Sequence, residues 1–154
     1  MATTITVPRE YGYVVATTAF TFFLGAWHGM RIGFFRKASG VGYPKPYADS
    51  GDIASASAEK KKQLYLFNCA QRAHGNYNEN HPSVAIAMLV TGLRYPIATT
   101  VMGVAWSVGR LVYALGYTKK DGSNGKGRLY GSFFWLPQFA LFGLAGWCGV
   151  KMVL

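Results

Sequence analysis

The feature that most constrains this chain is a polar segment that continues directly into an apolar one. Phe67–Pro82 reads FNCAQRAHGNYNENHP, and the apolar tract Ser83–Leu93 follows it without a break. A membrane-spanning helix needs about 20 residues, so the apolar tract alone is too short to cross a bilayer. We therefore predict one transmembrane helix over Phe67–Leu93, with the polar segment as its first half.

The polar side chains of this helix share one face. Because a helix turns once every 3.6 residues, side chains three or four positions apart lie above one another. Five residues follow that spacing and are called the polar stripe here: Asn68, Arg72, Asn76, Glu79 and Asn80. Charged side chains at membrane depth face a bundle interior or a wet cavity, which makes the stripe a candidate functional site. The alternative, an amphipathic helix lying on a membrane surface, is disfavoured because Ser83–Leu93 has no polar face to continue it.

Composition and charge favour a membrane protein. The chain has 154 residues, of which 51% are hydrophobic and only 14% are charged, whereas soluble domains are about 25% charged. Its formal net charge is +10, from 16 Lys and Arg against 6 Asp and Glu. These basic residues lie mostly between apolar tracts, which is typical of membrane proteins, so the charge does not indicate a nucleic-acid partner.

Four apolar segments predict an all-α fold: an integral membrane four-helix bundle formed by one domain, residues 1–154. The expected transmembrane helices are Tyr11–Phe35, Phe67–Leu93, Pro96–Tyr117 and Leu129–Leu154. The first is too long for a signal peptide, so we expect it to be retained. Glycines spaced by three or four residues in the first and last helices predict faces for close helix packing, and Pro137 predicts a kink in the last helix.

The basic residues predict an orientation for this bundle. One side carries Arg31, Arg36, Lys37, Lys45, Lys60, Lys61, Lys62, Lys119, Lys120, Lys126 and Arg128, and the other side carries Arg9, Arg94 and Lys151. By the positive-inside rule, the first and third loops are cytosolic and both termini lie on the opposite side. The polar start of the second helix and the Tyr117 end of the third helix then meet at one cytosolic mouth.

The residue types at this mouth point to a small charged ligand. We expect the stripe at this mouth together with Arg110, Tyr113 and Tyr117, which share one face of the third helix, and we expect further Lys and Arg side chains at the rim. We find no Ser/His/Asp arrangement, no metal-ligand spacing and no obvious nucleophilic cysteine; Cys69 and Cys148 fit as buried small residues. Arg binds carboxylates in a bidentate manner, and a glutamate can pair with an ammonium. Glutathione, with two carboxylates, an ammonium and a thiol, is one ligand of this kind.

Two stretches resemble a known family. Phe67–Pro82, quoted above, and Trp106–Tyr117, which reads WSVGRLVYALGY, resemble the membrane-associated proteins in eicosanoid and glutathione metabolism (MAPEG). The resemblance extends over nearly the whole chain. It implies a homotrimer of four-helix subunits, with glutathione as cosubstrate held between neighbouring subunits and with no metal.

The resemblance also assigns candidate glutathione-binding residues. They are Arg36, Lys37, Arg72, His74, Asn76, Glu79, Asn80, Arg110, Tyr113 and Tyr117. His74 and Asn80 stand where relatives that make leukotriene C carry glutamine and tyrosine. Arg36 or Lys37 resembles the basic end of the first helix, which in relatives reaches a glutathione carboxylate.

One cation is the candidate catalytic residue. In relatives the arginine that activates the thiol begins the fourth helix, and Arg128 is its nearest match. The third loop is longer here than in relatives that make leukotriene C, so Lys126 is the alternative. A nearby cation lowers the pKa of a thiol, which would supply the thiolate of glutathione without a nucleophile from the protein.

The expected function is therefore an enzyme: a glutathione transferase that also reduces lipid hydroperoxides, acting on lipophilic electrophiles that arrive through the bilayer. Two alternatives stay open. One is a non-catalytic protein of the same fold that presents lipid to a partner enzyme. The other is a channel or transporter subunit, although that class predicts polar residues at mid-depth on several helices. We expect the chain in the endoplasmic reticulum membrane, with the mitochondrial outer membrane as a second location.

Overall fold

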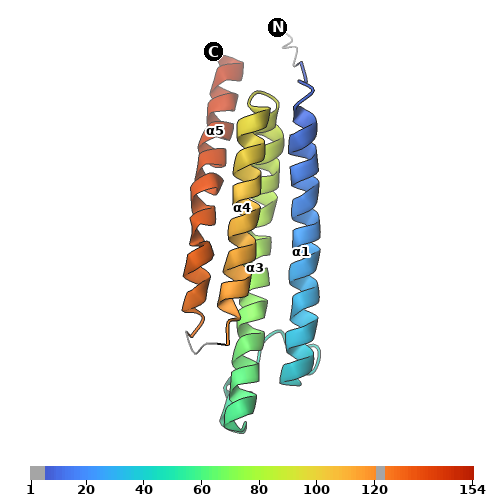
Figure 1. Ribbon diagram of the computed structural model, residues 1–154, viewed down its shortest axis with the longest axis vertical. Helices are drawn as coiled ribbons and strands as arrows, with labels where there is room; N and C mark the ends of the chain where they lie inside the picture. The colour runs from blue at the N-terminus through green and yellow to red at the C-terminus, as the bar shows by residue number, and fades with distance from the viewer. Residues whose placement is uncertain (1–5, 121–123) are drawn as a thin grey trace.

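The computed structural model describes residues 6–120 and 124–154, and all regular structure in them is helical (Figure 1). The elements are α1 (Tyr11–Ser39), α2 (Ser50–Ala54), α3 (Ala58–Gly92), α4 (Pro96–Tyr117), the 3-10 helix η1 (Lys126–Phe134) and α5 (Trp135–Val153). The predicted all-α class is confirmed. The residues 1–5 of the predicted domain, and 121–123 of its third loop, lie outside the described part of the chain.

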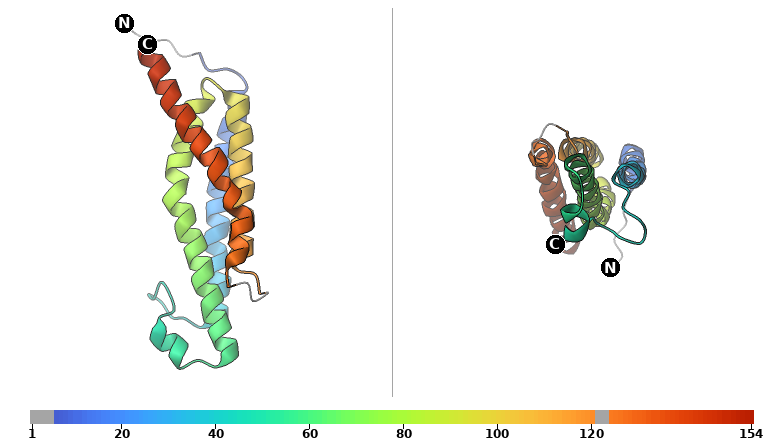
Figure 2. Two further views of the ribbon diagram at one scale, coloured as in Figure 1. Left: turned by 90° about the vertical axis from the view of Figure 1, so that its left-hand side faces the viewer. Right: turned by 90° about the horizontal axis from the view of Figure 1, so that it is seen from below.

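The four long helices run along one axis, with α3 and α4 in the middle. Helix α1 packs against α3 and α4 on one flank, and α5 packs against the same two helices on the other. Figure 2 shows α5 inclined to its neighbours. Both basic loops, the one after α1 and the one after α4, lie at the same end of the bundle, opposite the two termini (Figure 1).

Helix α3 begins well before the predicted start at Phe67. Its N-cap is Ser57, whose hydroxyl accepts the backbone N–H of Lys60 at 3.4 Å. The residues after this cap are mostly strong helix formers such as Ala, Glu and Lys. The prediction placed the start of the transmembrane helix at the first residue of the polar segment, Phe67, whereas the helix already begins at Ala58. Helix α1 likewise continues to Ser39 and ends at Gly40, whose φ of 67° favours glycine.

The predicted helix Leu129–Leu154 consists of two elements. The 3-10 helix η1 comes first, and α5 starts only at Trp135. Pro137 therefore lies in the first turn of α5, where its missing N–H breaks no helical hydrogen bond. The kink predicted inside the helix is corrected to a change of helix type before it.

Glycines allow η1 to lie directly on α4. A methyl group built on Gly131 would overlap the backbone of Tyr113, and one on Gly116 would overlap the backbone of Gly127. The glycines predicted to form packing faces in the first and last helices behave differently. Of these, Gly25 packs against Tyr77, but Gly29 in α1 and Gly146 in α5 face open space.

We expect Gly131→Ala to destabilise the chain, because its methyl group would push η1 off α4. Overpacking of this kind costs about 1–3 kcal/mol. The measurement is the thermal midpoint in detergent, with Gly12→Ala in the first turn of α1 as the control, since nothing lies within 4 Å of a methyl group there and Gly12 is not one of the glycines predicted to form a packing face. Equal midpoints for the two variants would contradict the close η1–α4 contact.

Two segments of the described chain are long and apolar enough to cross a membrane: Pro96–Tyr117 and Lys126–Val153. Helices α1 and α3 do not meet the same hydropathy criterion. In α3 the polar stripe lowers the mean hydropathy, and in α1 the Tyr, Thr, Gly and Trp residues dilute the Val, Leu and Phe. Length and composition thus support two of the four predicted spans.

Candidate functional site

The middle of the polar stripe forms one connected network on α3. Arg72 pairs with Glu79 through both nitrogens, at 2.6 Å (Nη1–Oε1) and 3.3 Å (Nη2–Oε2). Asn76 donates from Nδ2 to Oε2 of the same carboxylate at 3.4 Å. Because these residues occupy successive turns of α3, the spacing alone brings them together, as predicted.

Arg110 joins this network from α4. Its Nη1 donates to Asn76 Oδ1 at 2.7 Å, and its side chain is 0% exposed. The guanidinium carbon lies over the rings of Phe134, Tyr113 and Tyr77, at 4.3, 5.2 and 5.5 Å from their centroids. Nε and Nη2 of Arg110 have no hydrogen-bond partner within the described residues. A buried charged group with free donors is costly, so these two N–H groups point to an acceptor from outside the chain.

A row of aromatic rings connects Arg110 to Arg128. The ring of Tyr113 lies 5.6 Å from that of Tyr117 in an edge-to-face arrangement, and the guanidinium of Arg128 lies 4.9 Å from the centre of the Tyr117 ring. Arg128 also donates from Nη1 to the carbonyl of Gly125 at 2.9 Å, which fixes its orientation. One continuous path therefore contains Arg72, Asn76 and Glu79 of α3, Arg110, Tyr113 and Tyr117 of α4, and Arg128 of η1.

Three predicted residues do not join this path. Arg36 is buried, and its guanidinium binds carbonyl groups of the loop after α1. Lys37 is exposed at the end of α1. His74 lies about 200° around α3 from Arg72 and faces α1 instead, where its ring stacks on His28 with centroids 6.2 Å apart. Within this chain the structure does not bring these side chains to the network.

Asn80 is engaged inside the chain by a residue that the sequence analysis did not select. Gln138 of α5 is 2% exposed and accepts the indole N–H of Trp106 at Oε1, at 3.0 Å. An indole N–H is only a donor, so Nε2 of Gln138 has to face Asn80, where it donates to Oδ1 at 2.7 Å. Asn80 Nδ2 then donates to the carbonyl of Asn76 at 2.8 Å. Each end of the Asn80 amide therefore makes a hydrogen bond within the chain. The signal for Gln138 in the sequence is that it is the one amide side chain in the largely apolar helix α5.

No group of three or more His, Cys, Asp or Glu side chains in the described part of the chain could hold a metal ion. Both cysteines are buried and unpaired by disulfide. The chemistry available to the site is thus that of arginines, one carboxylate, amides and phenols.

Comparison with models of protein families identifies the family of this chain. The model of the MAPEG family matches residues 14–147. That range contains every residue of the network and of the aromatic row, together with most of α1 and α5.

Proposed function

The chain belongs to the MAPEG family, and we propose that it is a membrane-bound glutathione transferase and glutathione-dependent lipid hydroperoxide peroxidase. The family includes glutathione transferases and related membrane enzymes that use glutathione as cosubstrate. We further propose that it is a member similar to microsomal glutathione S-transferase 3, on the resemblance at Phe67–Pro82 and Trp106–Tyr117.

The observation that carries the proposal is the pair of unpartnered donors on buried Arg110. The third nitrogen of the same guanidinium, Nη1, donates to Asn76, which lies one helical turn from both Arg72 and Glu79. A carboxylate is the natural acceptor for a guanidinium. Arg72 and Glu79 form an ion pair with each other, and a ligand that brings both a carboxylate and an ammonium can replace each partner of this pair. Glutathione brings both.

The proposed chemistry starts from thiolate formation. A cation beside the sulfur favours the charged form of the thiol and releases its proton to water. Arg128 is the proposed cation because it is oriented by Gly125 and stacked on Tyr117, at the end of the row that leads to Arg110. Lys126, the alternative, is exposed.

The thiolate then reacts with a lipophilic partner. With an electrophile, a carbon–sulfur bond forms and the leaving group departs. With a lipid hydroperoxide, two glutathione molecules yield the alcohol, glutathione disulfide and water. The exposed apolar side chains along α1, α4 and α5 support a bilayer route for such partners.

We further propose the assembly and orientation expected from the sequence. Three copies would surround their glutathione sites, and the open-facing glycines of α1 and α5 support close contact between copies. The shared end of both basic loops supports a cytosolic placement of that end. The endoplasmic reticulum membrane is the proposed location, with the mitochondrial outer membrane as the second.

A non-catalytic lipid-presenting protein of the same fold is the second candidate. It needs no cation at the Tyr117 end of the site, whereas the chain places Arg128 there. One measurement separates the two functions: the ultraviolet difference spectrum of thiolate when glutathione is added to the purified protein at neutral pH. We expect thiolate absorbance in the Cys69→Ala/Cys148→Ala double variant, where the signal can come only from glutathione. Binding of glutathione without thiolate would support the non-catalytic candidate.

A further inference from the structure

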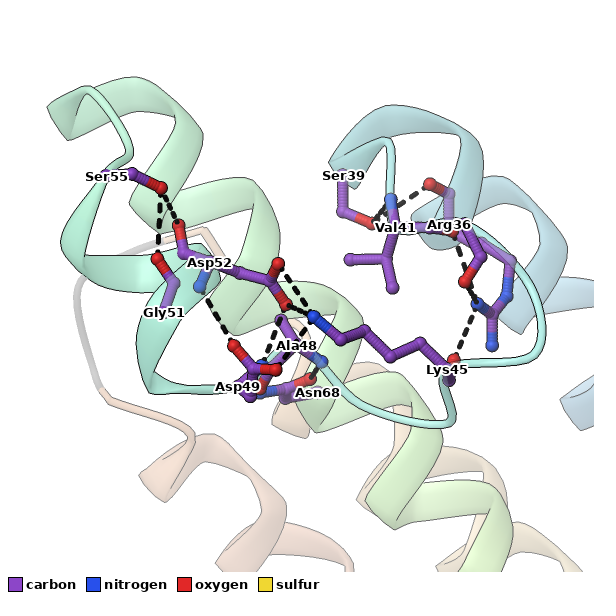
Figure 3. A network of polar contacts seen from close by, with 11 residues as sticks. Arg36, Ser39, Val41, Lys45, Ala48, Asp49, Gly51, Asp52, Ser55 and Asn68 are labelled. Atoms are coloured by element: carbon purple, nitrogen blue, oxygen red, sulfur yellow. Dashed lines mark hydrogen bonds and ion pairs between the residues drawn. The ribbon is translucent and has the colours of Figure 1, made fainter.

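The loop between α1 and α2 is a built structure rather than a flexible connection. Arg36 donates from Nη1 to the carbonyls of Val41, Gly42 and Lys45, at 3.3, 3.4 and 2.8 Å (Figure 3). Its guanidinium also lies 4.3 Å from the ring centre of Tyr43. The buried Arg36 side chain therefore binds the backbone of this loop at three positions.

An ion cluster holds the next part of the loop. Lys45 Nζ lies 2.7 Å from Asp49 Oδ2 and 2.8 Å from Asp52 Oδ2. The two aspartates also cap α2, since each carboxylate accepts the backbone N–H of the other residue at 2.9 Å. Hydrogen bonds from Lys45 hold the pKa of both carboxyls below the usual range. The cluster therefore stabilises the loop at neutral pH and is lost only as the pH falls through these lowered pKa values.

Helix α3 binds the loop on both sides of Tyr47. On one side Gln71 donates from Nε2 to the carbonyl of Pro46. On the other side Asn68 accepts the N–H of Ala48 at 2.8 Å and donates to its carbonyl at 2.9 Å. Both residues next to Tyr47 are therefore hydrogen-bonded to α3. Asn68, the first member of the polar stripe, makes two of these hydrogen bonds.

The Tyr47 hydroxyl and the Arg72 guanidinium both lie near Gly75 of α3. A methyl group built on Gly75 would lie 3.8 Å from Arg72 Nη1 and 3.9 Å from Tyr47 Oη, so both polar groups lie over the same glycine. Tyr47 is 41% exposed, and its hydroxyl makes no hydrogen bond within the described residues.

We propose that Tyr47 is a further binding residue of this site, presented by the fixed loop, and that its hydroxyl donates to the ligand carboxylate that Arg72 binds. This inference rests on the proposed function for the identity of the ligand, glutathione. The phenol of Tyr47 adds a hydrogen-bond donor beside the Arg72 guanidinium without adding charge. One oxygen of a ligand carboxylate could then accept from Arg72 and the other from Tyr47.

The test is glutathione binding to Tyr47→Phe, measured by calorimetry on the full chain in detergent. The variant keeps the ring and removes only the hydroxyl. Loss of a hydrogen bond to a charged group should weaken binding about ten-fold or more. Tyr43→Phe is the matched control: it lies in the same loop, keeps the ring that faces Arg36, and should bind as the unmodified chain does. Equal affinities of Tyr47→Phe and the unmodified chain would overturn the inference.

A second variant tests the role of the loop attachment. Asn68→Ala removes both bonds to Ala48, so it should weaken binding to a similar extent, and the double variant should be no weaker than Tyr47→Phe. If the two losses of binding free energy add in the double variant, Asn68 acts independently of Tyr47, and the inference that the loop presents Tyr47 to the ligand is overturned. If the unmodified chain binds no glutathione, the proposed function fails instead, and the two failures are distinguishable.

Discussion

Arg128→Ala is expected to lower turnover of glutathione with an aryl halide electrophile about a hundred-fold at neutral pH. A guanidinium stays charged under all working conditions, and near the sulfur it stabilises the thiolate far more than the thiol. Lowering a thiol pKa by two units corresponds to about 2.7 kcal/mol, which gives the hundred-fold effect. Because the thiol itself gains little, glutathione affinity should change much less than turnover.

The dependence on pH makes this prediction specific. Thiolate forms without help as the pH rises toward the ordinary thiol pKa, so turnover of Arg128→Ala should recover at high pH. Lys126→Ala is the control, because Lys126 is an exposed residue of the same segment. If Lys126→Ala removes the thiolate absorbance and Arg128→Ala does not, Lys126 is the activating cation and the assignment is wrong.

The parts of the site that the sequence could predict are those that depend on helical spacing. Arg72, Asn76 and Glu79 lie one turn apart, and any helix through them places them on one face. Helix α4 has the bounds of the predicted segment Pro96–Tyr117, because a proline opens it and a polar, glycine-rich stretch follows it. The contact between Arg110 and Asn76 agrees with the expected meeting of the two helices at one mouth.

The parts that the sequence could not predict depend on contacts between distant elements. Arg36 has the same charge whether it binds a ligand or loop carbonyls, and only the path of the following loop decides between them. Asn80 belongs to the stripe by spacing, but Gln138, which approaches on α5, turns its amide inward. Tyr47 lies near Gly75, as Arg72 does, in a loop whose backbone Asn68 and Gln71 bind to α3. Neither spacing nor composition contains this information.

Glu79→Gln is expected to weaken glutathione binding ten- to hundred-fold while the helices stay folded. The Glu79 side chain is about half exposed (53%) and pairs with Arg72, so its loss creates no buried unpaired charge. The glutamine keeps the size and an acceptor oxygen for Arg72, but it has no charge to balance the ammonium of the ligand. Hydrogen bonds to charged groups contribute about 1.5–3 kcal/mol, which corresponds to the stated range.

A glutathione analogue that lacks the amino group tests whether Glu79 binds the ammonium of the ligand. The unmodified chain should bind glutathione more tightly than its deaminated analogue, and Glu79→Gln should remove that preference, because the two ligands differ only in the group that Glu79 is expected to bind. Glu59→Gln, at the N-terminal end of the same helix, should leave the preference intact. A Glu79→Gln variant that still prefers glutathione by the full factor would assign the ammonium to another residue. It would then leave Glu79 with the single role of orienting Arg72, whose guanidinium it already holds at 2.6 Å.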